Sequence, residues 1–537
     1  VEYRYRQYGQ LGDYFCPACG FARPALDFAA TDVRLDARGA AFAVTSRATD
    51  RVDRVTTSQP TPYLVYNLLA ADAIMQLTGV DAAVFQRAVD AFDPRNGRLQ
   101  RYVIDGHPVL LNLAKNPTGF NQNLKIIERD AGPKAVAFFV NDYEGDGRDI
   151  SWIWDVDFEE LAGHGALAVF AGGTRANDLQ VRLKYAGIDA QLIDAVDDVF
   201  AMLPRLAAEG ALPADAGVYA IANYTALPPV HAALNRLAAR EEGVGKAEGA
   251  EGVRAAGAEA AQAAAPAPAP AAPQDTATPA GVPAPAPVVI AHLFPDLLNL
   301  YGDGGNVRIL EQRLAWRGIP VEVRRVHYGD VADLTGVDLV FLGGGPDREQ
   351  RLASEKLAEM RDDLAAYVAD DGPLLAICGG YQILGSQWLW GDELVPGLGI
   401  VDLETRRPGT SADRLTGDLV MSSPLASHPV VGYENHAGRT YLGEGVEPLG
   451  TVVSKAGHGN NDADRADGVR YRNVVGTYSH GPLLSKNPEV ADWLLARALE
   501  RQARRVGTEP LALSPLDDAV ELAANRWMVA RLGVEGA

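Results

Sequence analysis

An alanine- and proline-rich stretch near the middle of the chain limits how the chain can fold. Of the 25 residues from Ala263 to Pro287, eleven are Ala and eight are Pro. Proline removes a backbone donor and breaks helices, and alanine offers little side chain for a core, so this composition predicts no packed structure. We therefore expect a disordered, flexible linker over residues 241–287, with separate folded parts on either side.

Composition supports folded domains on both sides of this linker. The 537 residues are 47% hydrophobic, which is enough to bury a core in several domains. A formal charge of −21 opposes binding to phosphate backbones, so we expect no nucleic-acid partner. Three cysteines cannot form a disulfide framework, and no signal peptide or apolar run of about 18 residues is present. These features predict a cytoplasmic chain without a transmembrane segment. Because the chain opens on Val1 in mid-pattern, we also expect upstream sequence to be missing.

The part before the linker reads as two pieces. Residues 1–58 carry a cysteine pair and short alternating segments, which predict strands and turns. Residues 59–240 begin with helical spacing and then alternate between helices and apolar strands. Such alternation predicts a parallel sheet covered on both faces. The expected elements are a helix at Tyr63–Leu77, another helix opening at Asp157–Leu161, and strands at Val109–Leu113, Ala135–Val140, Leu167–Ala171 and Gly217–Ala222.

Residues 288–537 repeat the same alternation and predict a second doubly wound domain. The fold class is therefore α/β, with two doubly wound parallel-sheet domains and a partial zinc-ribbon-like segment at the N-terminus. Ligands of such sheets bind at the carboxyl ends of the strands, where Gly343–Gly345 and Cys378 fall. The expected elements are strands at Val288–Leu293, Val321–Val326, Asp338–Phe341, Leu374–Ile377 and Val474–Thr477, and helices at Gly305–Arg317 and Glu349–Val368.

Cys378 is the strongest candidate nucleophile. It directly follows the apolar strand 374–377 and is followed by Gly379-Gly380-Tyr381-Gln382 at the start of a helix. A strand-to-helix turn lifts a nucleophile out of the sheet, and the helix start lowers a thiol pKa and directs N–H groups at a developing oxyanion. The other interpretation is a buried cysteine with glycines for packing.

His480 is the matching candidate for a general base. It follows the strand 474–477, so it too lies where a strand ends. A histidine there could take the thiol proton and return it to a leaving amine. Alone, a histidine at a strand end would more often be structural.

These motifs resemble a known family. The segments 378–382, 343–347 and 480–484 are similar to class I glutamine amidotransferase domains of the cobyric-acid-synthase type. Closer still, Tyr301-Gly302-Asp303-Gly304-Gly305-Asn306, residues 343–350 and the segment Gly432–Thr440 look like GatD, the glutaminase subunit of lipid II isoglutaminyl synthase. The resemblance covers roughly residues 288–500.

The resemblance implies hydrolysis of glutamine through a thioester on Cys378, with His480 as general base and then acid. It implies backbone N–H groups of Gly379 and of the Gly344-Gly345 turn as oxyanion donors. Arg414 matches the family position that contacts the substrate glutamine, and Gln382 is expected to line the same pocket. The useful product would be ammonia.

The position two residues after His480 departs from the pattern. Many class I amidotransferases have a glutamate there, but this chain has Pro482. A histidine without an orienting carboxylate is a weaker base, so we expect an acid from elsewhere.

The first half of the chain supplies a candidate for that acid. Residues 112–122 and 146–159 resemble the C-terminal domain of MurT, the Mur-ligase-like partner of GatD. The resemblance implies that an aspartate of this part approaches the histidine, and it is assigned to Asp155, with Asp149 and Asp157 as rivals. Asp155 could instead be a helix N-cap.

Two further sites are incomplete in this sequence. Cys16 and Cys19 resemble one half of a zinc ribbon, whereas a structural zinc normally needs four ligands. Mur-type ligases use ATP with Mg²⁺ and a Gly-rich loop ending in Gly-Lys-Ser/Thr, but the Gly-Lys step here, Gly245-Lys246, is followed by Ala. Lys115 and Asn116 stand where Mur ligases have a substrate-contacting loop; otherwise they are surface residues.

The leading hypothesis is a fused, N-terminally incomplete lipid II isoglutaminyl synthase. It would transfer ammonia from glutamine to the α-carboxylate of D-glutamate in lipid II, at the inner face of the membrane and through peripheral contact with its lipid-linked substrate. The MurT-like and GatD-like parts would dock within one chain. The alternatives are an amidotransferase acting on a corrinoid or other acid, and a non-catalytic scaffold that recruits cell-wall enzymes.

Overall fold

The computed structural model describes residues 2–8, 11–36, 39–59, 61–92, 97–245, 286–390, 393–407 and 414–534. The chain divides into two compact units. Unit 1 contains Val1–Asn235 and Ala519–Met528, and unit 2 contains Arg236–Asp518 and Val529–Ala537. Most of the predicted linker, residues 246–285, lies outside the described residues. Helix α6 (Leu227–Gly245) continues past residue 240, where the linker was predicted to begin.

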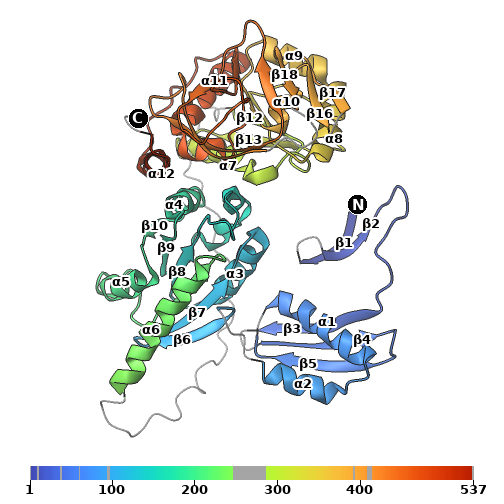
Figure 1. Cartoon of the computed structure of the whole chain (residues 1–537), viewed down its shortest axis with the longest axis vertical. Coiled ribbons are helices and arrows are strands. Elements are labelled where there is room, and N and C mark those ends of the chain that lie inside the picture. The colour runs from blue at the N-terminus through green and yellow to red at the C-terminus, as the bar shows by residue number, and fades with distance from the viewer. Residues whose placement is uncertain are drawn as a thin grey trace, which may run out of the picture. The chain divides into compact units, whose positions relative to one another are not determined.

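The N-terminal strands of unit 1 form two small antiparallel sheets (Figure 1). Helices α1 (Pro62–Leu77) and α2 (Ala82–Asp90) pack on the three-stranded sheet, and Val65 and Phe85 share its core with Phe42 and Val44. Residues 62–90 therefore pack with the strands before them, whereas the sequence placed a domain boundary at 58. The hairpin is β1 (Glu2–Tyr8) and β2 (Leu11–Phe15), and the three-stranded sheet is β3 (Phe28–Asp36), β4 (Gly39–Ser46) and β5 (Val52–Thr57).

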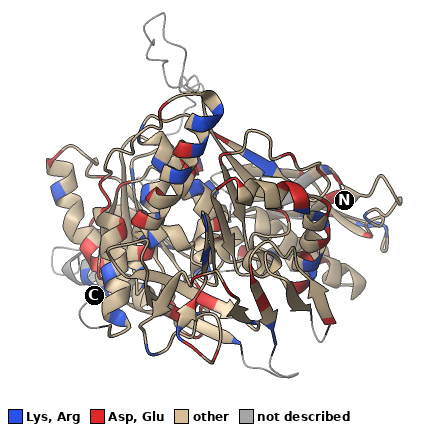
Figure 2. Ribbon diagram, turned by 90° about the horizontal axis from the view of Figure 1, so that it is seen from above, with Lys and Arg blue, Asp and Glu red and all other residues tan. Residues whose placement is uncertain are grey.

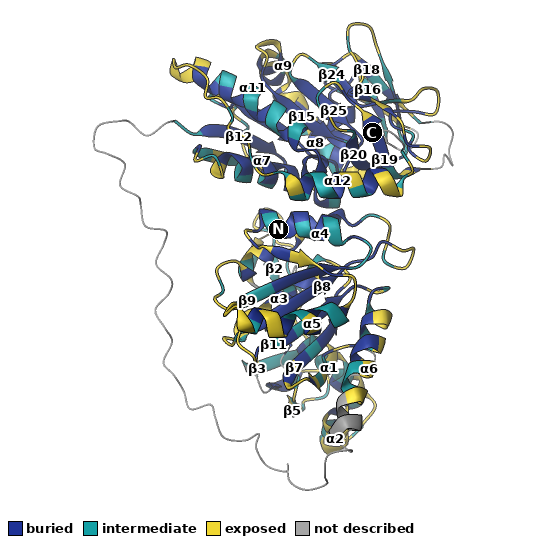
Figure 3. Ribbon diagram, turned by 90° about the vertical axis from the view of Figure 1, so that its left-hand side faces the viewer, coloured by how far each residue is buried: buried dark blue, intermediate teal, exposed yellow. Residues whose placement is uncertain are grey.

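The larger sheet of unit 1 has the strand order β10-β9-β8-β11-β7-β6. Neighbouring strands are parallel except for β6, which pairs antiparallel with β7. Every residue of β8 is buried, as expected for a central strand covered on both faces (Figure 3). The strands are β6 (Gln100–Ile104), β7 (His107–Leu113), β8 (Lys134–Phe139), β9 (Leu167–Gly172), β10 (Ala190–Leu192) and β11 (Gly217–Ala222). The helices are α3 (Pro117–Arg129), α4 (Ala176–Tyr185) and α5 (Val196–Ala208), with short 3-10 turns η1 (Ser151–Asp155) and η2 (Phe158–Leu161).

A C-terminal segment also belongs to unit 1. Residues 519–528 lie in helix α12 (Ala519–Arg531), and the fully buried Glu521 accepts two hydrogen bonds from Lys184 Nζ at 2.7 and 2.8 Å. The sequence analysis placed all of residues 288–537 in one domain, whereas residues 519–528 group with unit 1 in the structure. The pairing joins residues 337 positions apart, which local patterns do not reveal.

Unit 2 is built on a second sheet with the order β13-β12-β14-β15-β25-β24. Its strands are parallel except for β24, and β12, β14, β15 and β25 are entirely buried. The observed strands are β12 (Val288–Leu293), β13 (Val321–Val326), β14 (Leu339–Leu342), β15 (Leu374–Ile377), β24 (Val469–Tyr471) and β25 (Val474–Thr477). Helices α7 (Gly305–Ala315) and α11 (Pro488–Val506) belong to the same unit. The expectation of two doubly wound α/β parts is confirmed.

Two features of unit 2 differ from the sequence analysis. The long helix expected at 349–368 is two helices, α8 (Asp347–Glu359) and α9 (Arg361–Ala369), because the backbone at Met360 leaves the helical region with φ −110°. The described residues between 387 and 467 include small antiparallel sheets that the alternating pattern did not indicate. Their strands are β16 (Gln387–Trp390), β17 (Glu393–Pro396), β18 (Leu403–Arg406), β19 (Leu415–Ser422), β20 (Val430–His436), β21 (Arg439–Leu442), β22 (Gly450–Val452) and β23 (Ala466–Asp467).

Charged side chains of both signs are interspersed along the helices and strands (Figure 2). No helix within the described residues has both the length and the apolar character needed to cross a bilayer.

Candidate active site

Cys378 occupies a strained turn between β15 and the short helix α10 (Gly379–Ile383). Its backbone has φ 48° and ψ −104°, a conformation that non-glycine residues rarely adopt. The turn is held because Cys378 N–H donates to Thr477 O at 2.8 Å and Gly380 N–H donates to Gly343 O at 3.2 Å. A Cβ on Gly380 would lie 2.8 Å from Gly343 O, so only glycine fits there. The strained turn therefore places the thiol at the carboxyl edge of the sheet, as the sequence indicated.

His480 lies at the same edge, directly after β25 and its Tyr478-Ser479 turn. Its side chain is fully buried, and Nδ1 is 3.0 Å from Oδ1 of Asp303, whose side chain is also fully buried. Its backbone pairs with Tyr433 of β20 through hydrogen bonds of 2.8 and 3.2 Å. Within the described part of the chain, Nε2 makes no hydrogen bond. The imidazole is thus fixed through Nδ1, and Nε2 is the nitrogen left for proton transfer.

Electrostatics favour a charged imidazole. Burial by itself lowers the pKa of His480, but the negative charge of Asp303 and then that of Cys378 outweigh burial and hold the pKa well above its usual value. A proton that passes from Cys378 to His480 is therefore stabilised by Asp303. This is the electrostatic arrangement that a thiolate–imidazolium pair requires.

Asp303 was not assigned a role by the sequence analysis. It lies between the 3-10 turn η3 (Leu300–Gly302) and α7, within the segment 301–306 that carried the GatD resemblance. The sequence analysis expected an acid from elsewhere in the chain and assigned it to Asp155. The acid that lies beside His480 in the structure is Asp303, which is 177 residues away in sequence and meets His480 only in the folded sheet. The GatD-like segment 301–306 was the sequence signal from which Asp303 could have been identified.

Gly344 lies at the centre of this group. A Cβ there would be 3.0 Å from His480 Cε1 and 3.1 Å from both Asp303 Oδ2 and Cys378 Cβ. Its N–H donates to Asp303 Oδ2 at 2.8 Å, so it orients the acid, whereas the sequence assigned it to the oxyanion. Gly345 lines the cavity described next.

A cavity of about 530 Å³ opens beside Cys378. Its lining includes Tyr301, Arg414 and Asn435, and the predicted substrate residues Gln382 and Gly345. Gln382 is buried, with its Oε1 accepting from Gln350 at 2.9 Å and its Nε2 donating to Tyr478 OH at 3.0 Å. The structure thus brings Cys378 together with Arg414, Gln382 and Gly345 around one cavity.

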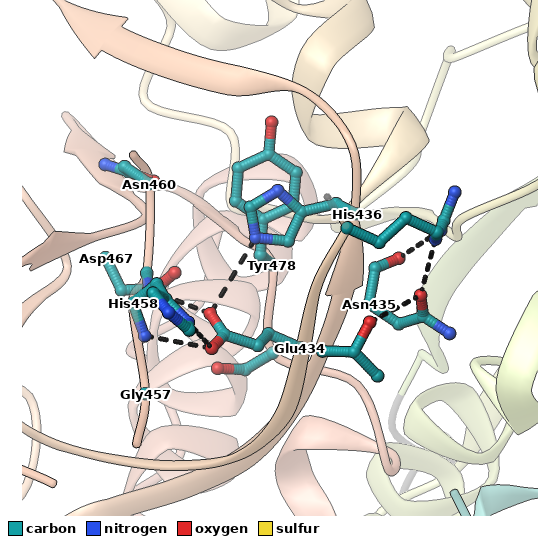
Figure 4. A network of polar contacts seen from close by, with 12 residues as sticks. Glu434, Asn435, His436, Gly457, His458, Asn460, Asp467 and Tyr478 are labelled. Atoms are coloured by element: carbon teal, nitrogen blue, oxygen red, sulfur yellow. Dashed lines mark hydrogen bonds and ion pairs between the residues drawn. The ribbon is translucent and has the colours of Figure 1, made fainter. Parts of the chain in front are cut away.

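A polar network around Glu434 (Figure 4) adjoins this cavity, because Asn435 and His436 line the cavity wall. The Glu434 carboxylate accepts from the backbone N–H groups of His458 and Gly459 at 2.9 and 2.8 Å, and lies 3.0 Å from His458 Nδ1. Burial raises the pKa of Glu434, but hydrogen bonds, first that of His436, reverse this effect and lower it below its usual value. The ring of His436 stacks on that of Tyr478, with centroids 3.5 Å apart. The network supports the turn that precedes His480.

The three aspartates proposed from the first half lie in unit 1. Asp155 is exposed at the end of η1, and its role stays a prediction. Of its rivals, Asp149 accepts from Ser151 N–H through Oδ1 at 2.8 Å, and Asp157 accepts from Asn121 Nδ2 through Oδ2 at 2.7 Å.

The incomplete sites also lie in unit 1. The thiols Cys16 and Cys19 follow β2 in a tight turn in which the backbone N–H of Cys19, first among several hydrogen bonds, lowers the pKa of Cys16. The described residues contain no group of three or more His, Cys, Asp or Glu side chains placed to hold a metal, so the pair does not complete a zinc site. Asn116 caps α3 by accepting from Gly119 N–H, and with Lys115 it lines a cavity of about 370 Å³.

The positions of nucleophile, base and acid define a class. A thiol and a carboxylate-oriented imidazole meet at the carboxyl edge of a doubly wound sheet, which is the layout of a hydrolase that acts through a covalent thioester. The carbonyl substrate would occupy the cavity beside Cys378.

Comparison with known proteins narrows this class. Residues 289–488 match the family profile of the CobB/CobQ-like glutamine amidotransferase domain, and residues 113–227 match that of the MurT ligase C-terminal domain. The GatD subunit of lipid II isoglutaminyl synthase (glutamine-hydrolyzing) from Staphylococcus aureus is 40% identical over 245 residues, which cover 45% of this chain and 96% of that protein. The GatD subunit from Streptococcus pneumoniae is 37% identical over 40% of this chain and 81% of that protein. The chain therefore belongs to the GatD family.

A second subunit of the same enzyme matches the first half. The MurT subunit from Staphylococcus aureus is 32% identical over 236 residues, covering 44% of this chain and 51% of that protein. The chain thus spans about half the length of its MurT relatives. GatD-like and MurT-like sequences are present on one polypeptide, as the sequence analysis expected.

Proposed function

We propose that unit 2 hydrolyses the side-chain amide of glutamine to glutamate and ammonia. The observation that carries this proposal is the position of the buried His480, whose Nδ1 is held by Asp303 at 3.0 Å while its pKa responds to the charge of Cys378. Membership of the GatD family and the glutamine amidotransferase profile support the same reaction.

Each step of the proposed reaction is assigned to particular residues. The sulfur of Cys378 attacks the amide carbon while His480 Nε2 takes the thiol proton, and the oxyanion accepts from the backbone N–H of Gly379, with Gly345 as second donor. Collapse breaks the carbon–nitrogen bond, and His480 gives its proton to the departing nitrogen, which leaves as ammonia. Water then attacks the γ-glutamyl thioester with His480 as base, which releases glutamate and restores the thiol.

The cavity provides groups for orienting glutamine. Arg414 is exposed at the cavity wall and is assigned to the α-carboxylate, because a guanidinium matches carboxylate geometry. Gln382 is assigned to the wall near Cys378, with its amide fixed by Gln350 and Tyr478.

The ammonia is proposed to serve the amidation of the D-glutamate α-carboxylate of lipid II to D-isoglutamine in peptidoglycan synthesis. The support is that both subunit types of lipid II isoglutaminyl synthase have counterparts on this chain. The lipid-linked substrate would place the reaction at the inner face of the membrane. The sequence contains no loop ending in Gly-Lys-Ser/Thr, so the residues present do not form that ATP site, and none is assigned to ATP or Mg²⁺.

Glutaminase activity is tested by measuring ammonia release from glutamine with wild-type protein and Cys378→Ala. We expect activity in the wild type and none in the variant, with unchanged thermal unfolding, because the turn contributes little to the core. Equal rates would contradict the proposal and favour a non-catalytic scaffold. Comparing Asp303→Asn with Asp155→Asn then separates the acid seen beside His480 from the one predicted in unit 1.

The wider reaction is tested by mass spectrometry of lipid II incubated with glutamine, ATP and the protein. The expected product carries an amide in place of the D-glutamate α-carboxylate. If the protein released ammonia from glutamine but left lipid II unchanged and amidated a corrinoid acid, lipid II would be refuted as the acceptor and the corrinoid acid would take its place.

A further inference from the structure

The last residues of β20 point to opposite faces of the strand. Glu434 and His436 are buried and belong to the polar network (Figure 4), whereas Asn435 between them is partly exposed and lines the cavity, to whose wall His436 also contributes. Because the Glu434 carboxylate is held by the backbone of His458 and Gly459, this end of β20 is fixed. Asn435 is therefore presented to the cavity from a rigid strand.

The side-chain amide of Asn435 both accepts and donates hydrogen bonds. Its Oδ1 accepts from Arg414 Nε at 2.8 Å and from Thr416 Oγ1 at 3.3 Å, and its backbone carbonyl accepts from Arg414 Nη2 at 2.7 Å. Its Nδ2 donates to Tyr301 OH at 2.7 Å. Arginine can only donate, so this orientation of the amide is the one that satisfies both partners.

Tyr301 carries this contact to the catalytic histidine. Its ring meets the imidazole of His480 edge to face, with centroids 5.1 Å apart and an interplanar angle of 73°. Its backbone has φ 55°, a strained conformation, and it lies two residues before Asp303. The position of Tyr301 therefore affects both members of the His480–Asp303 pair.

We propose that Asn435 is a positioning residue that couples the two ends of the glutamine site. It orients the Arg414 guanidinium for the α-carboxylate of an amino-acid substrate, and through Tyr301 it holds His480 in register with Cys378. This inference rests on the proposed glutaminase function. It predicts that loss of Asn435 affects both binding and chemistry.

The first test compares steady-state glutaminase kinetics. We expect Asn435→Ala to raise the KM for glutamine about tenfold and to lower kcat about tenfold, since its hydrogen bonds to the charged Arg414 guanidinium and to the Tyr301 hydroxyl are lost. Thr416→Val is the matched control, because it removes only the 3.3 Å bond to the same amide oxygen and leaves Tyr301 untouched; we expect KM and kcat within about twofold of wild type.

A double-mutant cycle tests the coupling itself. Tyr301→Phe removes the hydroxyl bonded to Asn435, and we expect kcat to fall about fivefold in the wild-type background but less than about twofold when Asn435→Ala is present. A residue with a purely structural role would give independent, additive effects. Additive effects, or unchanged KM and kcat in Asn435→Ala, would overturn the inference.

A second readout does not depend on glutamine turnover. The alkylation rate of Cys378 by iodoacetamide, followed by peptide mapping with Cys16 and Cys19 as internal references, reports the state of His480. We expect Asn435→Ala and Tyr301→Phe to slow labelling of Cys378 by a similar factor of about five and to leave the other two thiols unchanged. Equal labelling rates in wild type and both variants would overturn the inference, whereas a wild type without glutaminase activity would refute only the proposed function.

Discussion

Asp303→Asn tests how the carboxylate controls the histidine. In the structure Asp303 Oδ2 accepts from Gly344 N–H at 2.8 Å and Oδ1 faces His480 Nδ1 at 3.0 Å. An asparagine must turn its oxygen to the Gly344 N–H, because that group can only donate. Its amide nitrogen then donates to Nδ1, which forces the imidazole proton onto Nε2.

The wrong tautomer removes the base without changing the shape of the site. With a proton on Nε2, His480 cannot accept the proton of Cys378, and the stabilising charge of Asp303 is also lost. The corresponding substitution in serine hydrolase triads lowers kcat by about 10⁴-fold, so we expect a fall of about 10³- to 10⁴-fold here. The rate of ammonia release at saturating glutamine, with thermal unfolding to confirm folding, measures this effect.

A matched control is available on the surface of the same unit. Asp296 and His327 form another carboxylate–imidazole pair, 3.6 Å apart and partly exposed. Asp296→Asn should leave kcat within about twofold, since an exposed pair contributes little. If Asp303→Asn retained more than about a tenth of wild-type kcat, the role assigned to Asp303 would be refuted.

Three further predictions follow from the same geometry. Gly344→Ala should lower kcat at least about 100-fold by displacing His480 and Cys378, whereas Gly329→Ala, where a Cβ meets nothing within 4 Å, should not change kcat; a fully active Gly344→Ala would contradict the packing described. Arg414→Ala should raise the KM for glutamine about 30-fold or more with a smaller effect on kcat, and an unchanged KM would remove the carboxylate assignment. Burial raises the pKa of Asp467 from 3.8 to about 7, so the folded state binds an extra proton between these values and the free energy of unfolding falls as pH rises through that window. Asp467→Asn should abolish this fall and raise the free energy of unfolding at pH 8 by about 1–2 kcal/mol, which is below the upper limit of about 4 kcal/mol that corresponds to the full pKa shift. Denaturant titrations of both proteins from pH 4 to 8 measure this effect. A free energy of unfolding that still fell with pH in Asp467→Asn as it does in the wild type would contradict the prediction.

The regular parts of the fold could be predicted because their signals are local. The strands at 217–222, 288–293, 374–377 and 474–477 have the observed bounds, since buried parallel strands are continuous apolar runs between turn residues. The bounds of the partly exposed edge strand at 321–326 were also predicted. The antiparallel sheets between 387 and 467 were missed because most of their strands have four residues or fewer, and the longer β19 and β20 pair with each other outside the strand–helix alternation. The grouping of residues 519–528 with unit 1 could not be predicted, because their partner Lys184 is remote in sequence.

The candidate active site could likewise be predicted only where the sequence signal is local. Cys378 and His480 could be found from the turns that hold them, and Arg414 and Gln382 from motif resemblance. Asp303 could not be assigned from spacing, because only the folded sheet places it beside His480. The use of the Gly344 N–H by Asp303 likewise depends on three segments meeting at one edge.

Covalent labelling by a diazoketone analogue of glutamine tests the central claim most directly. The chain has three cysteines, so Cys16 and Cys19 serve as internal controls for Cys378. Intact mass and peptide mapping should show one adduct, on Cys378, that glutamate suppresses and that is lost in His480→Ala. Absence of the adduct in folded protein, or equal labelling of all three thiols, would contradict the assignment of Cys378 as an activated nucleophile in a glutamine site.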